Sequence, residues 1–154
     1  SEEEAESKAE IARAGARLEY EKAMVAPLRR LDVDVMVGVE ARGYLFGAPI
    51  ALELGISLVP VRKLGKLPWR TYSAEYSLEY GTATLEIHQD GVKAGARAVI
   101  VDDVLATGGT LEATAKLIEQ SDATVVAMAV LIELAELDGR ERLEGYNLES
   151  LMVV

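Results

Sequence analysis

Residues 98–112 place an apolar run, two adjacent acids, two adjacent glycines and a helix-forming sequence in that order. The run 98–101 is rich in β-branched residues, which is typical of a strand buried on both faces of a parallel sheet. Gly108 and Gly109 allow a tight turn whose backbone N–H groups approach a ligand closely. A helix that begins at Thr110 adds unpaired N–H groups and the positive end of its dipole. The segment therefore predicts an anion-binding loop at the carboxyl end of a strand, where open α/β sheets bind ligands.

Asp102 and Asp103 restrict the kind of phosphate compound that this loop would accept. Two carboxylates repel a bare phosphate, but they accept hydrogen bonds from the vicinal hydroxyls of a sugar whose phosphate the loop holds. Composition alone favours a plainer alternative, in which the acids form a solvated turn and the glycines serve only its geometry. The segment is neither a Walker A loop, which needs Gly-x-x-x-x-Gly-Lys-Ser/Thr, nor a dinucleotide-binding fingerprint.

Positive charge gathers in one short stretch, which contains Arg62, Lys63, Lys66 and Arg70. The formal net charge of the chain is −10, which argues against non-specific binding to nucleic acid and against an anionic membrane surface. A basic loop on an acidic protein suggests a small polyanionic ligand. A solvated loop explains the charge of this stretch equally well.

The length of 154 residues predicts a single domain, residues 1–154. No apolar run approaches the ~20 residues of a membrane span, and the opening Ser-Glu-Glu-Glu lacks the basic region of a secretory signal. The absence of cysteine excludes disulfides and thiolate metal sites. Because a chain without cysteine is suited to a reducing compartment, we expect a cytoplasmic protein.

Strand-like and helix-like segments alternate along the chain, which predicts an α/β fold with a parallel sheet and flanking helices. Residues 1–31 are predicted to be helical, with a capping box at Ser1 and Glu4. Residues 66–82 are predicted to be a mobile loop or a loose hairpin, and His88 is interpreted as a surface strand residue. The expected strands are 33–39, 57–61, 82–88, 98–101, 124–132 and 150–154, and the expected helices are 48–54, 111–120 and a short one within 138–143.

Residues 99–110, Val-Ile-Val-Asp-Asp-Val-Leu-Ala-Thr-Gly-Gly-Thr, resemble the phosphoribosyl-pyrophosphate (PRPP) motif of the type I phosphoribosyltransferases, in the form found in adenine phosphoribosyltransferases. Residues 40–47, Glu-Ala-Arg-Gly-Tyr-Leu-Phe-Gly, resemble the family's pyrophosphate-side loop. Residues 62–68, Arg-Lys-Leu-Gly-Lys-Leu-Pro, resemble its basic pyrophosphate-contacting block. Leu-Glu-Tyr-Gly at 78–81 resembles the signature of its catalytic flexible loop, which would here be a loop or hairpin over 62–88.

The resemblance implies a parallel-sheet phosphoribosyltransferase core that transfers 5-phosphoribose from PRPP to adenine, giving AMP and pyrophosphate in purine salvage. It also implies Mg²⁺ as cofactor, bound mainly by substrate oxygens and either without protein ligands or with Asp102 and Asp103, and a homodimer. The site residues that it implies fall into four groups. The 5′-phosphate would be held by Ala106, Thr107, Gly108, Gly109 and Thr110, and the ribose hydroxyls by Asp102 and Asp103. Pyrophosphate would be held by Arg42, Arg62, Lys63 and Lys66. Glu79 would handle the proton at purine N7, and Tyr80 would shield the reacting centre.

The resemblance covers residues 33–154 and departs from the family N-terminal to them. Residues 1–31 contain nothing like the Pro-Lys-Pro-Gly-Ile-Leu-Phe-Arg-Asp block of the hood that encloses adenine, so we expect the hood to be missing or replaced, as in a truncated or engineered chain. Two alternatives to an adenine phosphoribosyltransferase follow. One is a PRPP- or nucleotide-binding protein without efficient transfer, and the other is a scaffold in which the motifs are relics.

Overall fold

The computed structural model describes residues 5, 19, 22–78 and 80–154. The predicted capping box and the predicted catalytic Glu79 lie outside these residues. The strands are β1 (Val35–Val39), β2 (Ser57–Lys63), β3 (Thr71–Leu78), β4 (Gly81–His88), β5 (Arg97–Leu105), β6 (Thr124–Glu133) and β7 (Leu148–Val153). The helices are α2 (Gly43–Leu54), α3 (Gly109–Gln120) and α4 (Gly139–Arg142), with 3-10 helices η1 (Arg29–Leu31) and η2 (Ala135–Leu137), and residues 22–28 are also helical.

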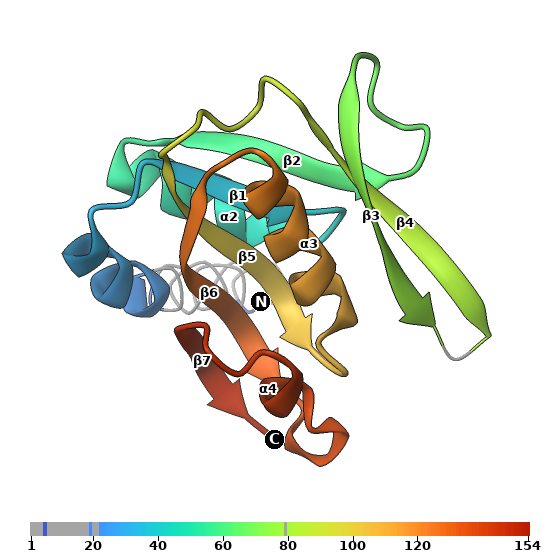
Figure 1. The fold of residues 1–154 in the computed structure, drawn as a ribbon. Helices are drawn as coiled ribbons and strands as arrows, with labels where there is room; N and C mark the ends of the chain where they lie inside the picture. The colour runs from blue at the N-terminus through green and yellow to red at the C-terminus, as the bar shows by residue number, and fades with distance from the viewer. Residues whose placement is uncertain (1–4, 6–18, 20–21, 79) are drawn as a thin grey trace.

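The strands form one sheet in the order β3-β4-β2-β1-β5-β6-β7 (Figure 1). The five strands from β2 to β7 in that order run parallel, so their carboxyl ends meet at the same edge. β3 and β4 form an antiparallel hairpin, which joins β2 through the pairs Arg62–Glu86 and Lys63–Leu85. The mostly parallel α/β fold confirms the predicted fold class.

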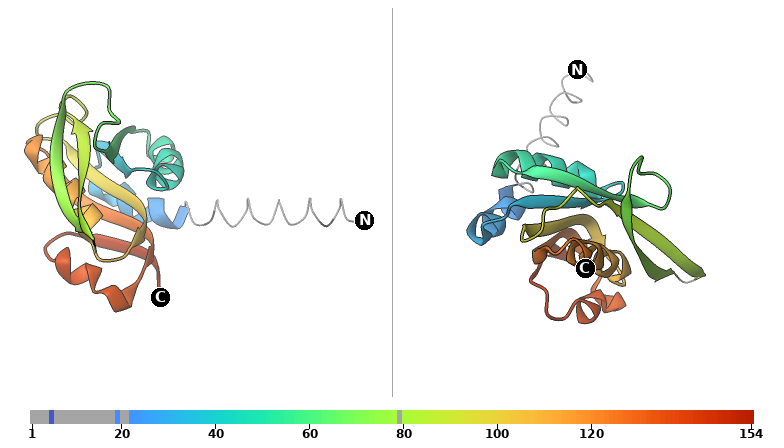
Figure 2. Two further views of the ribbon diagram at one scale, coloured as in Figure 1. Left: turned by 90° about the vertical axis from the view of Figure 1, so that its right-hand side faces the viewer. Right: turned by 45° about the horizontal axis from the view of Figure 1, so that its top comes forward.

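Helices cover both faces of the parallel strands (Figures 1 and 2). Alternate residues of β1 point to opposite faces: Val37 lies in the core on the α3 side, and Met36 lies in the core on the α2 side. Both are completely buried. Leu28 extends the α2-side core to the helix formed by residues 22–28. Burying one such side chain contributes roughly 1.5–3 kcal/mol, so the two apolar layers fix the sheet that carries the loops.

β5 is longer than the predicted strand 98–101. It continues to Leu105, and Asp102 pairs with Val130 of β6 while Leu105 pairs with Glu133. The two acids therefore lie inside the strand and not in the turn that follows it, which corrects the prediction. The reason is that β6 is long enough to pair with them, and pairing depends on backbone groups that an acidic residue supplies as well as an apolar one does.

Of the two forms predicted for residues 66–82, a mobile loop or a loose hairpin, the structure shows the hairpin, and residues 71–78 form its first strand, β3. Every residue of β3 has a partner on β4, from Thr71 with His88 to Leu78 with Gly81. Ala74 is buried and its neighbours Ser73 and Glu75 are exposed, which is the alternation of a strand with one face on a core. The alternation was hidden in the sequence because Ser, Glu and Tyr dominate this segment.

Candidate functional site

The loop between β5 and α3 surrounds a small cavity of about 70 Å³, lined by residues 104–111. Gly108 has φ +85°, in the left-handed region that favours glycine, and its carbonyl accepts a bond from Glu112 N–H at 3.0 Å. The N-terminus of α3 opens into this cavity, so unpaired N–H groups of the first turn face it. Gly108 and Gly109 are buried and Thr107 is exposed. The predicted loop therefore lies at the expected end of the sheet, and its role in binding an anion stays a prediction.

The connection from β6 to α4 packs tightly against this loop. A Cβ atom on Gly139 would lie 2.2 Å from the carbonyl oxygen of Ala106, and one on Gly108 would lie 2.8 Å from the carbonyl oxygen of Gly139. Arg142 lies over Gly109 and forms an ion pair with Glu112, with Nε and Oε2 2.7 Å apart. Sequence analysis did not assign Gly139 or Arg142 to the site, although the turn at Asp138-Gly139 was a possible signal.

Asp102 and Asp103 have different environments at the end of β5. Asp102 is 9% exposed, and its Oδ1 accepts a bond from Asp103 N–H at 2.8 Å. Burial is the main reason that the pKa of Asp102 rises to about 7; the Asp103 carboxylate acts in the same direction, whereas the bond from the Asp103 N–H and the charge of Arg42 oppose the rise. Asp103 Oδ2 lies 2.6 Å from Arg42 Nε. The structure thus brings predicted residues of the PRPP motif and of the 40–47 block into direct contact.

The basic stretch after β2 lies against Glu40, the residue that follows β1. Lys66 Nζ lies 2.5 Å from Glu40 Oε1, Arg62 Nε lies 3.5 Å from Oε2, and Lys63 N–H donates to Oε2 at 2.9 Å. The hydrogen bond from Lys66 is the main reason that the pKa of Glu40 falls to about 2, and the Lys63 N–H and the charge of Arg62 act in the same direction. Two of the predicted pyrophosphate cations, Lys66 and Arg62, therefore lie against one carboxylate, and a third, Arg42, pairs with Asp103. Sequence analysis missed Glu40, although it begins the 40–47 block.

Tyr80 lies in the turn of the β3–β4 hairpin. Tyr80 is 90% exposed and Leu78 is 50% exposed, so Tyr80 is not packed against the other predicted site residues. The base of the hairpin is attached: Tyr76 lies 3.6 Å from where a Gly109 Cβ atom would be, and Gln120 of α3 donates to the carbonyl oxygen of Ser73 at 3.2 Å.

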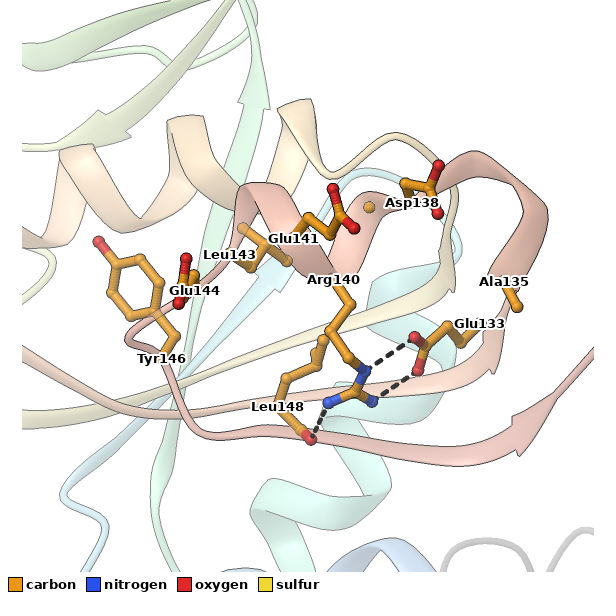
Figure 3. A pocket seen from close by; sticks show the side chains of 10 residues that line it. Glu133, Ala135, Asp138, Arg140, Glu141, Leu143, Glu144, Tyr146 and Leu148 are labelled. Carbon is orange, nitrogen blue, oxygen red and sulfur yellow. Dashed lines mark hydrogen bonds and ion pairs between the residues drawn. The ribbon is translucent and has the colours of Figure 1, made fainter.

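A larger cavity of about 760 Å³ lies beside the loop between β5 and α3 (residues 104–111), which we call the phosphate loop after its predicted ligand. The predicted site residues do not line this cavity (Figure 3). Arg140 crosses it, donating to Glu133 Oε1 at 2.9 Å, to Oε2 at 2.6 Å, and to the carbonyl oxygen of Leu148 at 3.3 Å. The bonds from Arg140 hold the pKa of Glu133 below its ordinary value. These bonds tie α4 to the ends of β6 and β7, and so they hold Gly139 against the phosphate loop.

The described residues contain no group of three or more His, Asp or Glu side chains placed to hold a metal ion by themselves. Asp102 and Asp103 nevertheless offer carboxylate oxygens, the ligands that Mg²⁺ prefers, and this ion usually takes one or two carboxylates together with substrate phosphates. The donor set fits a metal shared with a phosphorylated substrate. In the part of the chain that the structure describes, no helix is long and apolar enough to cross a membrane.

A glycine loop at the carboxyl edge of a parallel sheet, an acid pair before it and a cation cluster beside it define a protein that binds a phosphorylated sugar. Comparison with known families makes the class specific, because residues 3–151 match the phosphoribosyl transferase domain. The chain belongs to the phosphoribosyltransferase family. The family match begins at residue 3, whereas the motifs by themselves resembled the family only from residue 33 onward.

Individual relatives agree with this assignment. The adenine phosphoribosyltransferase of Desulfitobacterium hafniense is 57% identical over 130 residues, which cover 84% of this chain and 75% of the relative. The crystal structure of adenine phosphoribosyltransferase from Thermoanaerobacter pseudethanolicus has a TM-score of 0.90 at 49% identity, covering 94% of this chain and 84% of that one. That of the Trypanosoma brucei enzyme, in complex with AMP, pyrophosphate and ribose-5-phosphate, has a TM-score of 0.83 at 26% identity, covering 91% and 65%.

Proposed function

We propose that the protein is an adenine phosphoribosyltransferase, which transfers 5-phosphoribose from PRPP to N9 of adenine and releases AMP and pyrophosphate. The observation that carries the proposal is the contact between Arg42 and Asp103 at 2.6 Å, which joins the pyrophosphate-side loop to the ribose-side acids. A diphosphate on C1 of a ribose needs these two groups side by side. The relatives named as adenine phosphoribosyltransferases support adenine as the acceptor base.

Each group then has a role in positioning. The backbone N–H groups of residues 106–110, with the Thr107 and Thr110 hydroxyls, hold the 5′-phosphate, and Asp102 and Asp103 accept bonds from the ribose hydroxyls. Arg42, Arg62, Lys63 and Lys66 face pyrophosphate, whose charge grows as the C1–oxygen bond breaks. A transition state of oxocarbenium character needs positioning and electrostatic stabilisation and no nucleophile. Each charged hydrogen bond of this kind contributes roughly 1.5–3 kcal/mol.

Mg²⁺ would be held mainly by substrate oxygens, where it would neutralise charge on the diphosphate, and Asp102 and Asp103 are the carboxylates that could join them as ligands. The burial that raises the pKa of Asp102 to about 7 makes a neighbouring cation favourable for its ionised form. Glu79 handles the proton at purine N7, and Tyr80 shields the reacting centre. Because Tyr80 is 90% exposed, the hairpin end must move toward the loop for this, as lids do in many transferases.

A PRPP-binding protein without efficient transfer was the main alternative from the sequence. The 57% identity to a named transferase does not favour it. The homodimer and the cytoplasmic location implied by the sequence remain part of this proposal.

AMP formation from adenine and PRPP with Mg²⁺ tests the proposal, and calorimetry measures PRPP binding separately. We expect the double variant Asp102→Asn and Asp103→Asn to lose transfer while its thermal unfolding stays that of a folded protein. Asp90→Asn, in an exposed turn, is the matched control and should retain full activity. PRPP binding without AMP formation in the unaltered chain would contradict the transferase and support the alternative.

A further inference from the structure

Glu40 has contacts that differ from those of an ordinary surface acid. Its side chain is 10% exposed; it accepts hydrogen bonds from the Lys66 ammonium at 2.5 Å and the Lys63 N–H at 2.9 Å, and the Arg62 guanidinium lies 3.5 Å away as an ion-pair partner. These donors come from the same basic stretch that the proposed function assigns to pyrophosphate. Glu40 therefore holds the groups that the proposed function assigns to the leaving diphosphate.

The donor set resembles what a phosphate oxygen would receive. A backbone N–H and a lysine ammonium are usual donors to phosphate oxygens, and they bind a carboxylate in a similar way, while a nearby guanidinium adds positive charge. The side chains of Lys66 and Arg62 are 46% and 37% exposed, so an anion from solvent can reach them. The negative charge of Glu40, at a few ångströms, lowers the attraction of these cations for any such anion.

We propose that Glu40 competes with a pyrophosphate oxygen for Lys66, Arg62 and the Lys63 N–H and thereby weakens the affinity of the basic stretch for pyrophosphate. The inference rests on the proposed function. Glu40 acts through Lys66 and Arg62 and is a positioning residue: it keeps the cations gathered before the substrate arrives. Once the bond between the diphosphate and C1 has broken, the Glu40 carboxylate forms its ion pairs with Lys66 and Arg62 again, which favours the release of pyrophosphate.

Calorimetric titration of the full chain with pyrophosphate and, separately, with AMP, both with Mg²⁺, tests the proposal. Glu40→Gln keeps an oxygen for the Lys63 N–H and removes the charge. We expect pyrophosphate to bind on the order of tenfold more tightly, the size of one partly screened charge interaction. AMP binding should not change, because its phosphate is held by residues 106–110.

Glu40→Asp serves as a second variant, since it keeps the charge but draws it back from Lys66 by one methylene. It should tighten pyrophosphate binding in the same direction by a smaller factor. Glu53→Gln is the matched control, because Glu53 also forms an ion pair, with Arg29 at 2.9 Å, but lies in α2 near its C-terminal end. This control should change neither affinity.

Weaker or unchanged pyrophosphate binding in both Glu40 variants would overturn the proposal, and so would an equal change in AMP affinity, which would indicate general damage to the site. Absence of pyrophosphate binding in the unaltered chain would also overturn it. If the unaltered chain binds pyrophosphate and shows these shifts but forms no AMP, the proposed transfer fails while the role of Glu40 stands.

Discussion

The phosphate loop and the end of the β3–β4 hairpin present their predicted residues in opposite ways. In the loop, Gly108 and Gly109 are buried, and the connection through Gly139 leaves no room for a Cβ atom. At the hairpin end, Leu78 is 50% exposed and Tyr80 is 90% exposed. The backbone groups predicted to hold the phosphate are built into the fold, whereas the side chain of Tyr80, for its predicted role, would have to be brought to the substrate.

This difference implies that stability and activity are coupled in one region and separable in the other. A change in the loop disturbs packing that the sheet and α4 share, so it should affect folding and binding together. A change at the hairpin end removes few contacts in the ligand-free protein, so its effect should be confined to turnover. Substitutions in the two regions therefore test the comparison directly.

Gly139→Ala should have the largest effect on stability. Its new Cβ atom would lie 2.2 Å from the carbonyl oxygen of Ala106, and because the neighbour is backbone, relief requires movement of the phosphate loop. We expect a loss of about 3 kcal/mol or more in the free energy of unfolding, measured by urea denaturation, together with weaker AMP binding.

Gly81→Ala, at the start of β4, is the matched substitution in the hairpin. Gly81 has φ +110° and no atom within 4 Å of a built Cβ, so its cost is the backbone conformation alone, about 1–2 kcal/mol. Equal losses for the two alanine variants would show that the loop is no more tightly packed than the hairpin, against the comparison made above.

Glu133→Gln should have an intermediate effect that depends on pH. The hydrogen bonds from Arg140 hold the pKa of Glu133 below its ordinary 4.5, so the ionised form is stabilised in the folded state. This contribution is fully present above pH 4.5 and is lost as the pH falls through the lowered pKa. Because Arg140 is half exposed, we expect only about 1–2 kcal/mol at pH 7.

The measurement is the free energy of unfolding of Glu133→Gln and of the unaltered protein from pH 7 to pH 3. The difference between them should shrink as the pH falls below 4.5. Glu53→Gln provides the comparison, because its pair with Arg29 is exposed on both sides and should contribute little at any pH. A constant difference across the range would mean that the ionised carboxylate is not what holds α4 in place.

The sequence predicted the phosphate loop well because local chemistry decides its form. The β-branched run favours an extended backbone, the paired glycines permit a tight turn, and the residues after them favour a helix. β5, the loop and α3 follow in that order. The length of β5 was not predictable in the same way, since Asp102 and Asp103 extend the strand only because β6 lies beside them. Tertiary pairing there outweighs the low strand propensity of aspartate.

The sequence did not predict which side chains from distant segments of the chain contact one another. Glu40 and Lys66 are far apart in the chain, and nothing local indicates that their side chains meet at 2.5 Å. The same holds for Gly139 against Ala106. The motifs did indicate which loops share one edge of the sheet, because the carboxyl ends of parallel strands meet there. Motifs therefore predict the neighbourhood of a site, and three-dimensional packing determines its ion pairs.

Tyr80→Ala should have the smallest effect on stability and a clear effect on catalysis. With its side chain 90% exposed, the substitution should change the free energy of unfolding by less than about 0.5 kcal/mol. If Tyr80 shields the reacting centre in the closed state, kcat for AMP formation should fall on the order of tenfold or more while PRPP affinity is retained. Steady-state kinetics and urea denaturation on the same preparation measure both.

Tyr76→Ala on the same hairpin separates exposure from residue type. Tyr76 packs against the core on the α3 side and lies near Gly109, so its loss should cost about 2 kcal/mol of stability. A Tyr80 variant that unfolds as readily as the Tyr76 variant would show that the hairpin end is packed in solution. An unchanged kcat for Tyr80→Ala would instead remove Tyr80 from the chemistry and leave Glu79 as the predicted contribution of the hairpin.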